Sequence, residues 1–237
     1  MLTVIIADKS GLKWAQEQVK RHHYLHAPVD DRCSPVAMLA MLFDRPVGCL
    51  IFGRPEATRV NGWYGSLEDV QTGRCRLTRW EILNLARVWF DPALQQNGEW
   101  YHRPGMIGPS VLPGFYDRKH DWHSAVASFV LDLALEQIVF HYLVCKPPVW
   151  MEEPYQISEV LSYCDSRKHK GTLYRASGFT LVRANTHGIE TYVRPVRSLT
   201  PTEQTLIAYR SQHNPRCRKL REIRRAASYE QLSWAPA

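Results

Sequence analysis

The stretch Glu159–Leu181, EVLSYCDSRKHKGTLYRASGFTL, is the one around which we expect the rest of the chain to be organised. It contains a short apolar run, a polar turn with Asp165 and His169, a compact helical segment and a second apolar run. A strand that leads through a turn into a helix brings its last residues and the first N–H groups of the helix to one point, where an anionic ligand is favoured. We therefore expect the functional site at this point.

The sequence around this stretch predicts an α/β domain with a mixed, mostly antiparallel central sheet flanked by helices. Apolar runs predict strands, and apolar residues at helical spacing predict helices. Strands are expected at 2–7, 36–43, 47–52, 80–90, 157–163, 179–183 and 190–194, and helices at 9–21, 123–140 and 171–177. Val60–Arg79 has no clear period and is expected to be a connecting region or a weak strand pair. Residues 93–122 carry too many Gly and Pro breakers for regular structure and are expected to form a long insertion loop.

Composition and charge indicate the cellular location and the kind of partner to expect. The chain has 237 residues, a formal net charge of +7 and six cysteines scattered singly, which predicts mostly buried free thiols. There is no apolar run of about 18 residues, so we expect a cytoplasmic protein without a membrane partner. The positive charge suits a polyanionic partner, although it would equally serve solubility. We expect a domain at 1–197 and a basic helical C-terminal extension at 198–237.

Several polar side chains are candidates for chemistry. Asp165 follows an apolar run, so its carboxylate would orient or deprotonate an amine, or else cap the next helix. His23 and Tyr24 follow a helix, where an imidazole could relay protons and a phenol could stack on a base; the alternative is an aromatic cluster at a helix end. His22 and His26, four residues apart, would share a helix face, but obvious partner ligands for a metal are lacking.

Other candidates lie on the predicted central strand and core helix. Arg87 would be costly inside an apolar strand unless it is paired, with Asp165 or Glu81, or holds a ligand. Asp91 ends the same strand and would cap the following turn. Two serines near the start of the core helix, Ser124 and Ser128, are expected to contact a cofactor phosphate or to be ordinary helix-start residues.

The order of predicted elements and the ending Tyr174-Arg175-Ala176-Ser177-Gly178-Phe179 resemble the GNAT acetyltransferases. Three phrases together, HHYLH, LNLARVWFDP and LSYCDSRKHKGTLYRASGF, are similar to the phage Mom DNA-modification proteins, a GNAT-like family. The resemblance covers roughly residues 20–193 and fits poorly over the long loop. It implies conversion of adenine N6 in DNA to a methylcarbamoyl, glycinamide-like derivative that protects the DNA from restriction.

The resemblance also implies roles for residues in these phrases. His23, Tyr24, Arg87 and Asp165 would form the catalytic set, and His169, Gly171 and Tyr174 would contact acetyl-CoA or a related acyl donor. Tyr174 would protonate the departing thiolate, or else be a half-buried core tyrosine. The usual GNAT pyrophosphate loop Q/R-x-x-G-x-G/A is missing, and a metal requirement is left open.

A modified adenine must be flipped out of the duplex, so the implied partner is double-stranded DNA, with the oligomeric state left open and a homodimer among the options. Aromatic and basic residues interleaved in the long loop would hold the flipped base, and basic residues of the extension would contact phosphates. These residues are Trp100, Tyr101, Arg103, Tyr116, Arg118, Lys119, Arg218, Lys219 and Arg221. The alternatives are a loop folded over the core and a solvated helix face.

Three hypotheses for function follow. The first is a Mom-type DNA adenine modification enzyme. The second is an acyl-CoA-dependent N-acyltransferase acting on a protein or RNA amine, against which the missing pyrophosphate loop counts. The third is a non-enzymatic nucleic-acid-binding protein on a GNAT scaffold.

Overall fold

The computed structural model of the chain describes residues 2–60, 62–91, 122–141, 157–197, 200–202 and 204–205, with side chains 127–138 in the helix 122–140. Its elements are, in order, β1 (Leu2–Ile6), α1 (Lys9–His22), the 3-10 turn η1 (Asp31–Cys33), β2 (Val36–Leu42), β3 (Arg45–Gly53), β4 (Tyr64–Gly65), α2 (Leu67–Gln71), β5 (Leu77–Thr78), η2 (Arg79–Glu81), β6 (Ile82–Phe90), α5 (Trp122–Phe140), β7 (Glu159–Asp165), α6 (Thr172–Ala176), β8 (Thr180–Ala184) and β9 (Ile189–Pro195).

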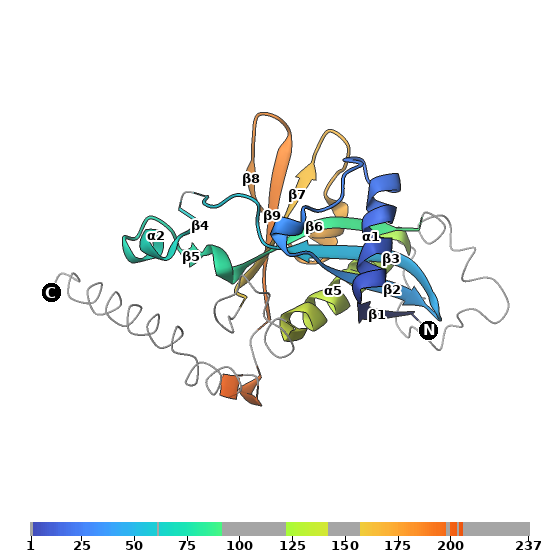
Figure 1. Cartoon of the computed structure of the whole chain (residues 1–237). Helices are drawn as coiled ribbons and strands as arrows, with labels where there is room; N and C mark the ends of the chain where they lie inside the picture. The colour runs from blue at the N-terminus through green and yellow to red at the C-terminus, as the bar shows by residue number, and fades with distance from the viewer. Residues whose placement is uncertain are drawn as a thin grey trace. The chain divides into compact units, whose positions relative to one another are not determined.

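Seven strands form one sheet in the order β1-β2-β3-β6-β7-β9-β8 (Figure 1). The pairs β1–β2, β2–β3, β3–β6 and β8–β9 are antiparallel. The central strands β6 and β7 begin at the same end, because the Ser158 N–H donates to the Glu81 carbonyl, 2.8 Å away, one residue before each strand. They are therefore parallel, as the crossover through α5 requires. The predicted mixed, mostly antiparallel sheet is confirmed.

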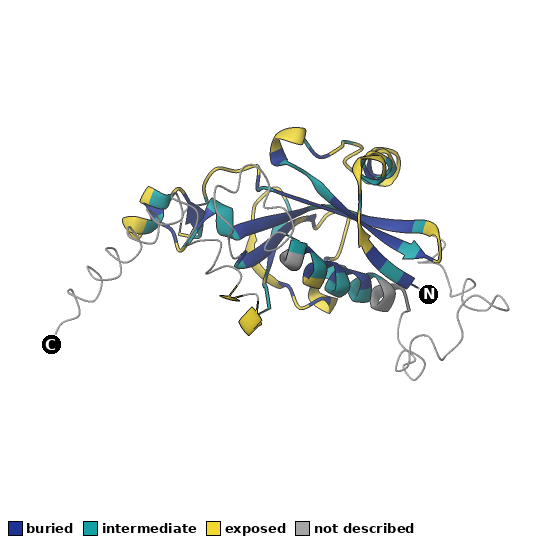
Figure 2. Cartoon of the chain, turned by 60° about the horizontal axis from the view of Figure 1, so that its bottom comes forward, coloured by how far each residue is buried: buried dark blue, intermediate teal, exposed yellow. Residues whose placement is uncertain are grey.

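Helix α1 packs on one face of the sheet through small apolar side chains. Ala15 and Val19 of α1 are fully buried against side chains of β2 and β3. The residues of that cluster are Ala15, Val19, Val29, Cys33, Ala37, Leu39, Cys49 and Ile51, and Trp14 and Trp89 pack beside it. Figure 2 shows α5 along the opposite side of the sheet from α1. The sheet is therefore covered on both faces, which accounts for its almost continuously apolar central strands.

Both ends of α1 are determined by nearby residues. The Asp8 carboxylate accepts a hydrogen bond from Gly11 N at 2.8 Å and so caps the start. The helix ends at His22, because His23 has extended backbone angles of φ −77° and ψ 140°. The expectation that His22 and His26 share a helix face is therefore wrong: His26 lies beyond the helix with φ +46°.

Most predicted boundaries differ from the observed ones by one or two residues, and three of these differences concern the central strands and the site. The expected strand from Trp80 starts later, at Ile82, because the carboxylate of Glu81 accepts hydrogen bonds from the backbone N–H and hydroxyl of Thr78, both at 2.8 Å, and holds a 3-10 turn. The strand expected to stop at Tyr163 continues to Asp165. The helix expected from Gly171 begins one residue later, since Gly171 has a left-handed φ of +65°.

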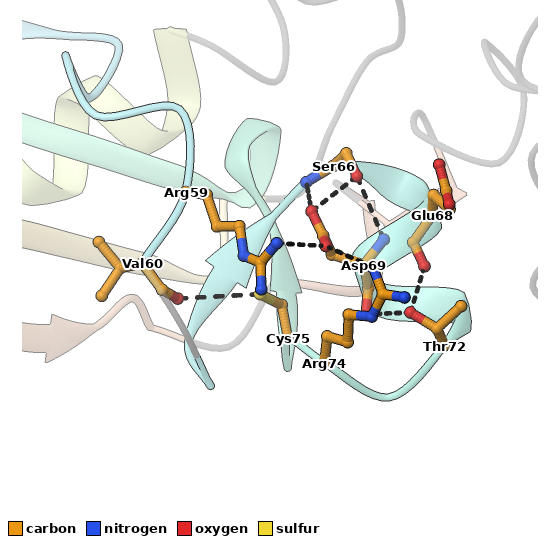
Figure 3. Close-up of polar contacts among 8 residues, drawn as sticks. All are labelled: Arg59, Val60, Ser66, Glu68, Asp69, Thr72, Arg74 and Cys75. Carbon is orange, nitrogen blue, oxygen red and sulfur yellow. Dashed lines mark hydrogen bonds and ion pairs between the residues drawn. The ribbon is translucent and has the colours of Figure 1, made fainter.

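The chain divides into two compact units. The first unit consists of Met1–Gly53, Asn84–Ile138 and Val160–Pro195. The second unit consists of Arg54–Leu83, Val139–Glu159 and Val196–Ala237. In the second unit, the stretch expected to be a connection or weak strand pair contains a short parallel pair, β4–β5, and the short helix α2. Its centre is Asp69, whose carboxylate accepts from the Ser66 N–H at 3.0 Å and the Ser66 hydroxyl at 2.7 Å (Figure 3). Arg59 lies 3.3 Å from the same carboxylate. These bonds lower the pKa of Asp69, the Ser66 hydroxyl contributing most.

Most of the predicted insertion loop and of the C-terminal extension lies outside the described residues. The boundary expected between 197 and 198 accordingly stays a prediction. Within the part of the chain that the structure describes, no helix combines the length and apolar character that crossing a membrane requires.

Candidate active site

Side chains from three separate segments of the first unit meet near the end of β7. The loop after α1 contributes His23 and Tyr24, β6 contributes Arg87, and the turn after β7 contributes His169. The rings of His23 and Tyr24 stack with centroids 4.4 Å apart, and the rings of Tyr24 and His169 are 5.0 Å apart. The positive charge of Arg87 acts on His23. Residues from all three phrases singled out in the sequence are therefore neighbours.

His23 is held neutral. Burial is the main cause of lowering its pKa to about 4, and the positive charges of Arg87, His169 and His26 add to the effect. The Leu25 N–H donates to His23 Nδ1 at 3.2 Å, so the neutral ring carries its proton on Nε2. In this tautomer Nε2 is a hydrogen-bond donor, which suits stabilising a developing negative charge better than relaying a proton.

The loop that carries His23 and Tyr24 is fastened at two points. The amide of Gln16 bonds both backbone groups of Val29, donating to its carbonyl at 3.0 Å and accepting from its N–H at 2.8 Å. The Arg87 guanidinium donates to the Ala27 carbonyl at 3.4 Å and to the Ala86 carbonyl at 2.7 Å. Arg87 thus ties β6 to this loop. The carboxylates expected to pair with it have other partners: Arg167 for Asp165 and Thr78 for Glu81.

Tyr24 lies between the histidines and the end of β7. Its pKa is raised, chiefly by burial and then by the negative charge of Asp165, so the phenol stays protonated at neutral pH. The Lys168 ammonium lies 5.1 Å from the centre of the Tyr24 ring, within the range of a cation–π contact. Tyr24 therefore offers a polarised ring face and a hydroxyl donor at the site.

Asp165 is the last residue of β7 and is buried, with 4% of its surface exposed. Its carboxylate accepts three hydrogen bonds from Arg167: from the backbone N–H at 3.1 Å, from Nε at 2.9 Å and from Nη2 at 2.8 Å. The side-chain bond to Arg167 is the main cause of lowering the pKa of Asp165 to about 2. The alternative of a helix cap does not apply, because Gly171 stands at the start of α6.

Tyr174 of α6 reaches back to the middle of the two parallel strands. Ser162 Oγ on β7 lies 2.8 Å from the Leu85 carbonyl oxygen on β6 and 3.0 Å from the Tyr174 hydroxyl. A serine hydroxyl has one proton, so when Ser162 donates to Leu85 the Tyr174 hydroxyl donates to Ser162. Burial raises the pKa of Tyr174 to about 12. Tyr24 and Cys164 also raise it, which places Tyr174 beside the other site residues.

Gly171 has a packing role. A Cβ there would lie 2.3 Å from the Tyr192 hydroxyl, which accepts from Arg175 at 2.8 Å and donates to Glu190 at 2.8 Å. Only glycine lets α6 approach β9 so closely at this left-handed φ. Gly171 therefore positions the helix that carries Tyr174, and a direct contact with a donor stays a prediction.

The remaining predicted residues are elsewhere. The His22 ring stacks on Trp89 at 5.3 Å and His26 Nδ1 lies 3.3 Å from the Lys20 carbonyl. Among the described residues no group of three or more His, Cys, Asp or Glu could hold a metal. Asp91 lies 3.5 Å from Arg45 and Ser128 is half-buried on α5. Outside the described residues or side chains lie Ser124, Trp100, Tyr101, Arg103, Tyr116, Arg118, Lys119, Arg218, Lys219 and Arg221.

Sequence reasoning missed four residues of the site: Ser162, Arg167, Lys168 and Gln16. An Asp followed two residues later by a long donor is a local signal for the Asp165–Arg167 turn. Ser162, a hydroxyl inside an apolar strand, signals a buried partner. Gln16 gives no local signal, because its partner is 13 residues away in the following loop.

Comparison with models of protein families found no match, and comparison with curated proteins also found none. Among solved structures, the chain is similar to the ribosomal-protein-S18-alanine N-acetyltransferase from Escherichia coli, with a TM-score of 0.44 at 10% identity over 85% of this chain and 97% of that one. It is also similar to an aminoglycoside acetyltransferase in complex with coenzyme A, with a TM-score of 0.42 at 12% identity over 82% and 95% of the two chains. A third similar structure is a Bacillus subtilis acetyltransferase in complex with CoA, with a TM-score of 0.41 at 8% identity over 83% of this chain and 100% of that one.

Proposed function

We propose that the protein is an N-acyltransferase that moves an acyl group from a coenzyme A thioester to an amine. The observation that carries the proposal is the hydroxyl of Tyr174, which lies 3.0 Å from Ser162 Oγ in the middle of β7 and is kept protonated by burial. The element order expected from the GNAT resemblance accompanies it. A phenol whose pKa is raised to about 12 stays protonated at neutral pH, so its proton is available to the sulfur as the C–S bond breaks.

The site residues divide the chemistry among them. The amine nitrogen attacks the thioester carbonyl, a C–N bond forms and the C–S bond breaks. Nε2 of His23 donates to the carbonyl oxygen as negative charge develops there. The sulfur takes the phenolic proton of Tyr174, and the proton that the amine loses passes through water to the phenolate, so that Tyr174 is protonated again.

Asp165 orients the amine rather than deprotonating it. With its pKa at about 2, the carboxylate is a weak base, but it remains a strong hydrogen-bond acceptor. An amine N–H donating to Asp165 would present its lone pair in a fixed direction. Orientation of this kind contributes to rate by holding the reacting atoms together.

The donor needs a place for its pyrophosphate. The first-turn N–H groups of α5, a helix of 19 residues, are donors of the kind that hold phosphate. They follow the core strand in the position that the GNAT resemblance implies, although the usual glycine-rich loop is missing from the sequence. Arg87 is the residue that would hold the acyl carbonyl end of the donor.

The test uses acetyl-CoA and two matched variants. Calorimetry with CoA measures donor binding without an acceptor, and thiol release with a panel of amines measures transfer. Tyr174→Phe should lower the turnover about 10²- to 10⁴-fold with unchanged CoA affinity. Tyr163→Phe, one residue from Ser162 on β7 and 39% exposed, is the control and should behave as wild type. Absence of CoA binding, or equal turnover in Tyr174→Phe and wild type, would refute the proposal.

A second candidate acceptor is adenine N6 in duplex DNA, as the Mom resemblance implies. The observation that favours it is the row of planar rings from His23 through Tyr24 to His169, with Lys168 over Tyr24. A flipped base is held by such stacking, and cations beside it attract its phosphates. Mass spectrometry of nucleosides from expressing cells tests it: modified deoxyadenosine with wild type and none with Asp165→Asn is expected, and unmodified deoxyadenosine with wild type contradicts it.

A further inference from the structure

Among the described contacts, Arg167 donates all three hydrogen bonds to the Asp165 carboxylate, yet the Arg167 side chain is 67% exposed. An exposed arginine side chain loses conformational freedom when it is fixed against a carboxylate. The guanidinium nevertheless forms a bidentate pair with the carboxylate, in which Nε and Nη2 donate at 2.9 and 2.8 Å. A second contact also limits where the Arg167 side chain can go.

That contact is the turn between β8 and β9. Its end is Gly188, and a Cβ built there would lie 3.1 Å from Arg167 Cγ and 3.3 Å from Arg167 Cδ. The stem of Arg167 thus lies directly across the Gly188 backbone. Figure 1 shows the end of β7 and the β8–β9 turn at the same end of the sheet.

The two turns are fastened together by hydrogen bonds. The backbone N–H and the hydroxyl of Ser166 both donate to the Gly188 carbonyl, at 2.8 and 2.9 Å. The β8–β9 turn is itself closed by Asn185, whose side-chain oxygen accepts from the N–H groups of His187 at 2.9 Å and Ile189 at 2.8 Å. Gly188 is therefore held in place, and because it has no side chain, the Cγ and Cδ atoms of Arg167 can pack against its backbone.

We propose that the Asn185–Gly188 turn keeps Arg167 on Asp165, and that Gly188 is a positioning residue for the carboxylate of the site. Gly188 acts through Arg167, and Arg167 acts through Asp165. The catalytic meaning of this arrangement rests on the proposed function, in which Asp165 orients the amine. The arrangement itself is a matter of contacts and can be measured without any substrate.

Other charged and titratable groups also face Asp165. Lys168 lies on the same turn, Tyr24 approaches from the loop after α1, and Cys164 precedes it on β7. None of these touches Gly188 in the described contacts. A change at Gly188 should therefore reach Asp165 through Arg167.

The test is a carboxyl ¹³C NMR titration of Asp165 in the full chain, with Asp165→Asn to assign the signal. Gly188→Asn adds a Cβ against the Arg167 stem, and asparagine tolerates the left-handed φ of +76°. The control is Gly178→Asn, since Gly178 has a matching φ of +71° and nothing within 4 Å of an added Cβ. Gly188→Asn should raise the midpoint of Asp165 by at least about half a pH unit, and Gly178→Asn should leave it unchanged.

Arg167→Gln sets the upper limit of the effect and should raise the midpoint further than Gly188→Asn does. Ser166→Ala, which removes one bond to the Gly188 carbonyl and adds no bulk, should give a smaller rise and serves if Gly188→Asn does not fold. An unchanged midpoint in both Gly188→Asn and Ser166→Ala, or an equal rise in Gly178→Asn, would overturn the proposal. Because no acyl donor is used, failure here leaves the proposed acyl transfer untouched, and failure of acyl transfer leaves this titration interpretable.

Discussion

On acidification, the variant His23→Phe should lose less of its free energy of unfolding than the wild-type protein does. His23 has a pKa of about 4 in the folded chain and an ordinary value of 6.5 when unfolded. Between these values the unfolded chain binds a proton that the folded chain does not. Stability linked to His23 is therefore complete above about pH 6.5 and falls as the pH decreases toward 4.

The size of the effect follows from these two values. Each pH unit of difference is worth about 1.4 kcal/mol, so acidification from about pH 7.5 to pH 4.5 would cost at most about 2.6 kcal/mol through His23. The ring is half-buried, and solvent screening reduces this to about 1–2 kcal/mol. Titrating groups that do not interact with His23 contribute equally to wild type and His23→Phe, and they cancel in the difference.

Urea unfolding at both pH values, for wild type and His23→Phe, measures this difference. Phenylalanine keeps a ring against Tyr24 but removes the acceptor of the Leu25 N–H, a loss that is the same at both pH values. Wild type should lose about 1–2 kcal/mol more than the variant on acidification. Equal losses for the two proteins would show that His23 is not held neutral, and the assignment of Nε2 as a donor would fail with it.

Three further predictions concern contacts that support the site or the second unit. Ser162→Ala leaves the Tyr174 hydroxyl and the Leu85 carbonyl without their shared partner and should cost about 1–3 kcal/mol in urea unfolding, and an unchanged midpoint contradicts it. Gln16→Leu removes both hydrogen bonds to Val29 and should raise the hydrogen-exchange rate of the Val29 N–H at least about tenfold. An unchanged exchange rate would show that Gln16 does not hold this loop. Glu159→Gln keeps an acceptor for Trp63, so it should lower the melting temperature less than Glu159→Ala; the opposite order refutes this role.

Element order was predictable from the sequence because apolar runs and turn residues are local signals. The strands over 36–52 and the helix α1 lie close to their expected positions for this reason. Boundaries failed where one side chain holds the backbone, as Glu81 does at Thr78. The helix α2 was missed although Ser66 and Asp69 have the spacing of a capping box, because the polar stretch around it lacks helical periodicity.

The site was predictable only in part. The candidates His23, Tyr24 and Asp165 came from phrases far apart in the chain, and the structure brings them together. The partner of Asp165 was not foreseen, since a buried carboxylate accepts whichever donor the turn geometry delivers, and here that is Arg167 rather than Arg87. The tautomer of His23 depends on the Leu25 N–H, a contact that only the folded loop creates.

The central claim is transfer of an acyl group to an amine with Tyr174 as the acid, and one labelling measurement tests it most directly. Acetyl-CoA carrying ¹³C in the acetyl group is incubated with the protein and with separate peptide, RNA and DNA fractions, and amide label is followed by mass spectrometry. We expect label in one amine fraction, retained in Tyr163→Phe and reduced at least about 100-fold in Tyr174→Phe. Label in no fraction with folded wild-type protein, or equal label in wild type and Tyr174→Phe, would contradict it.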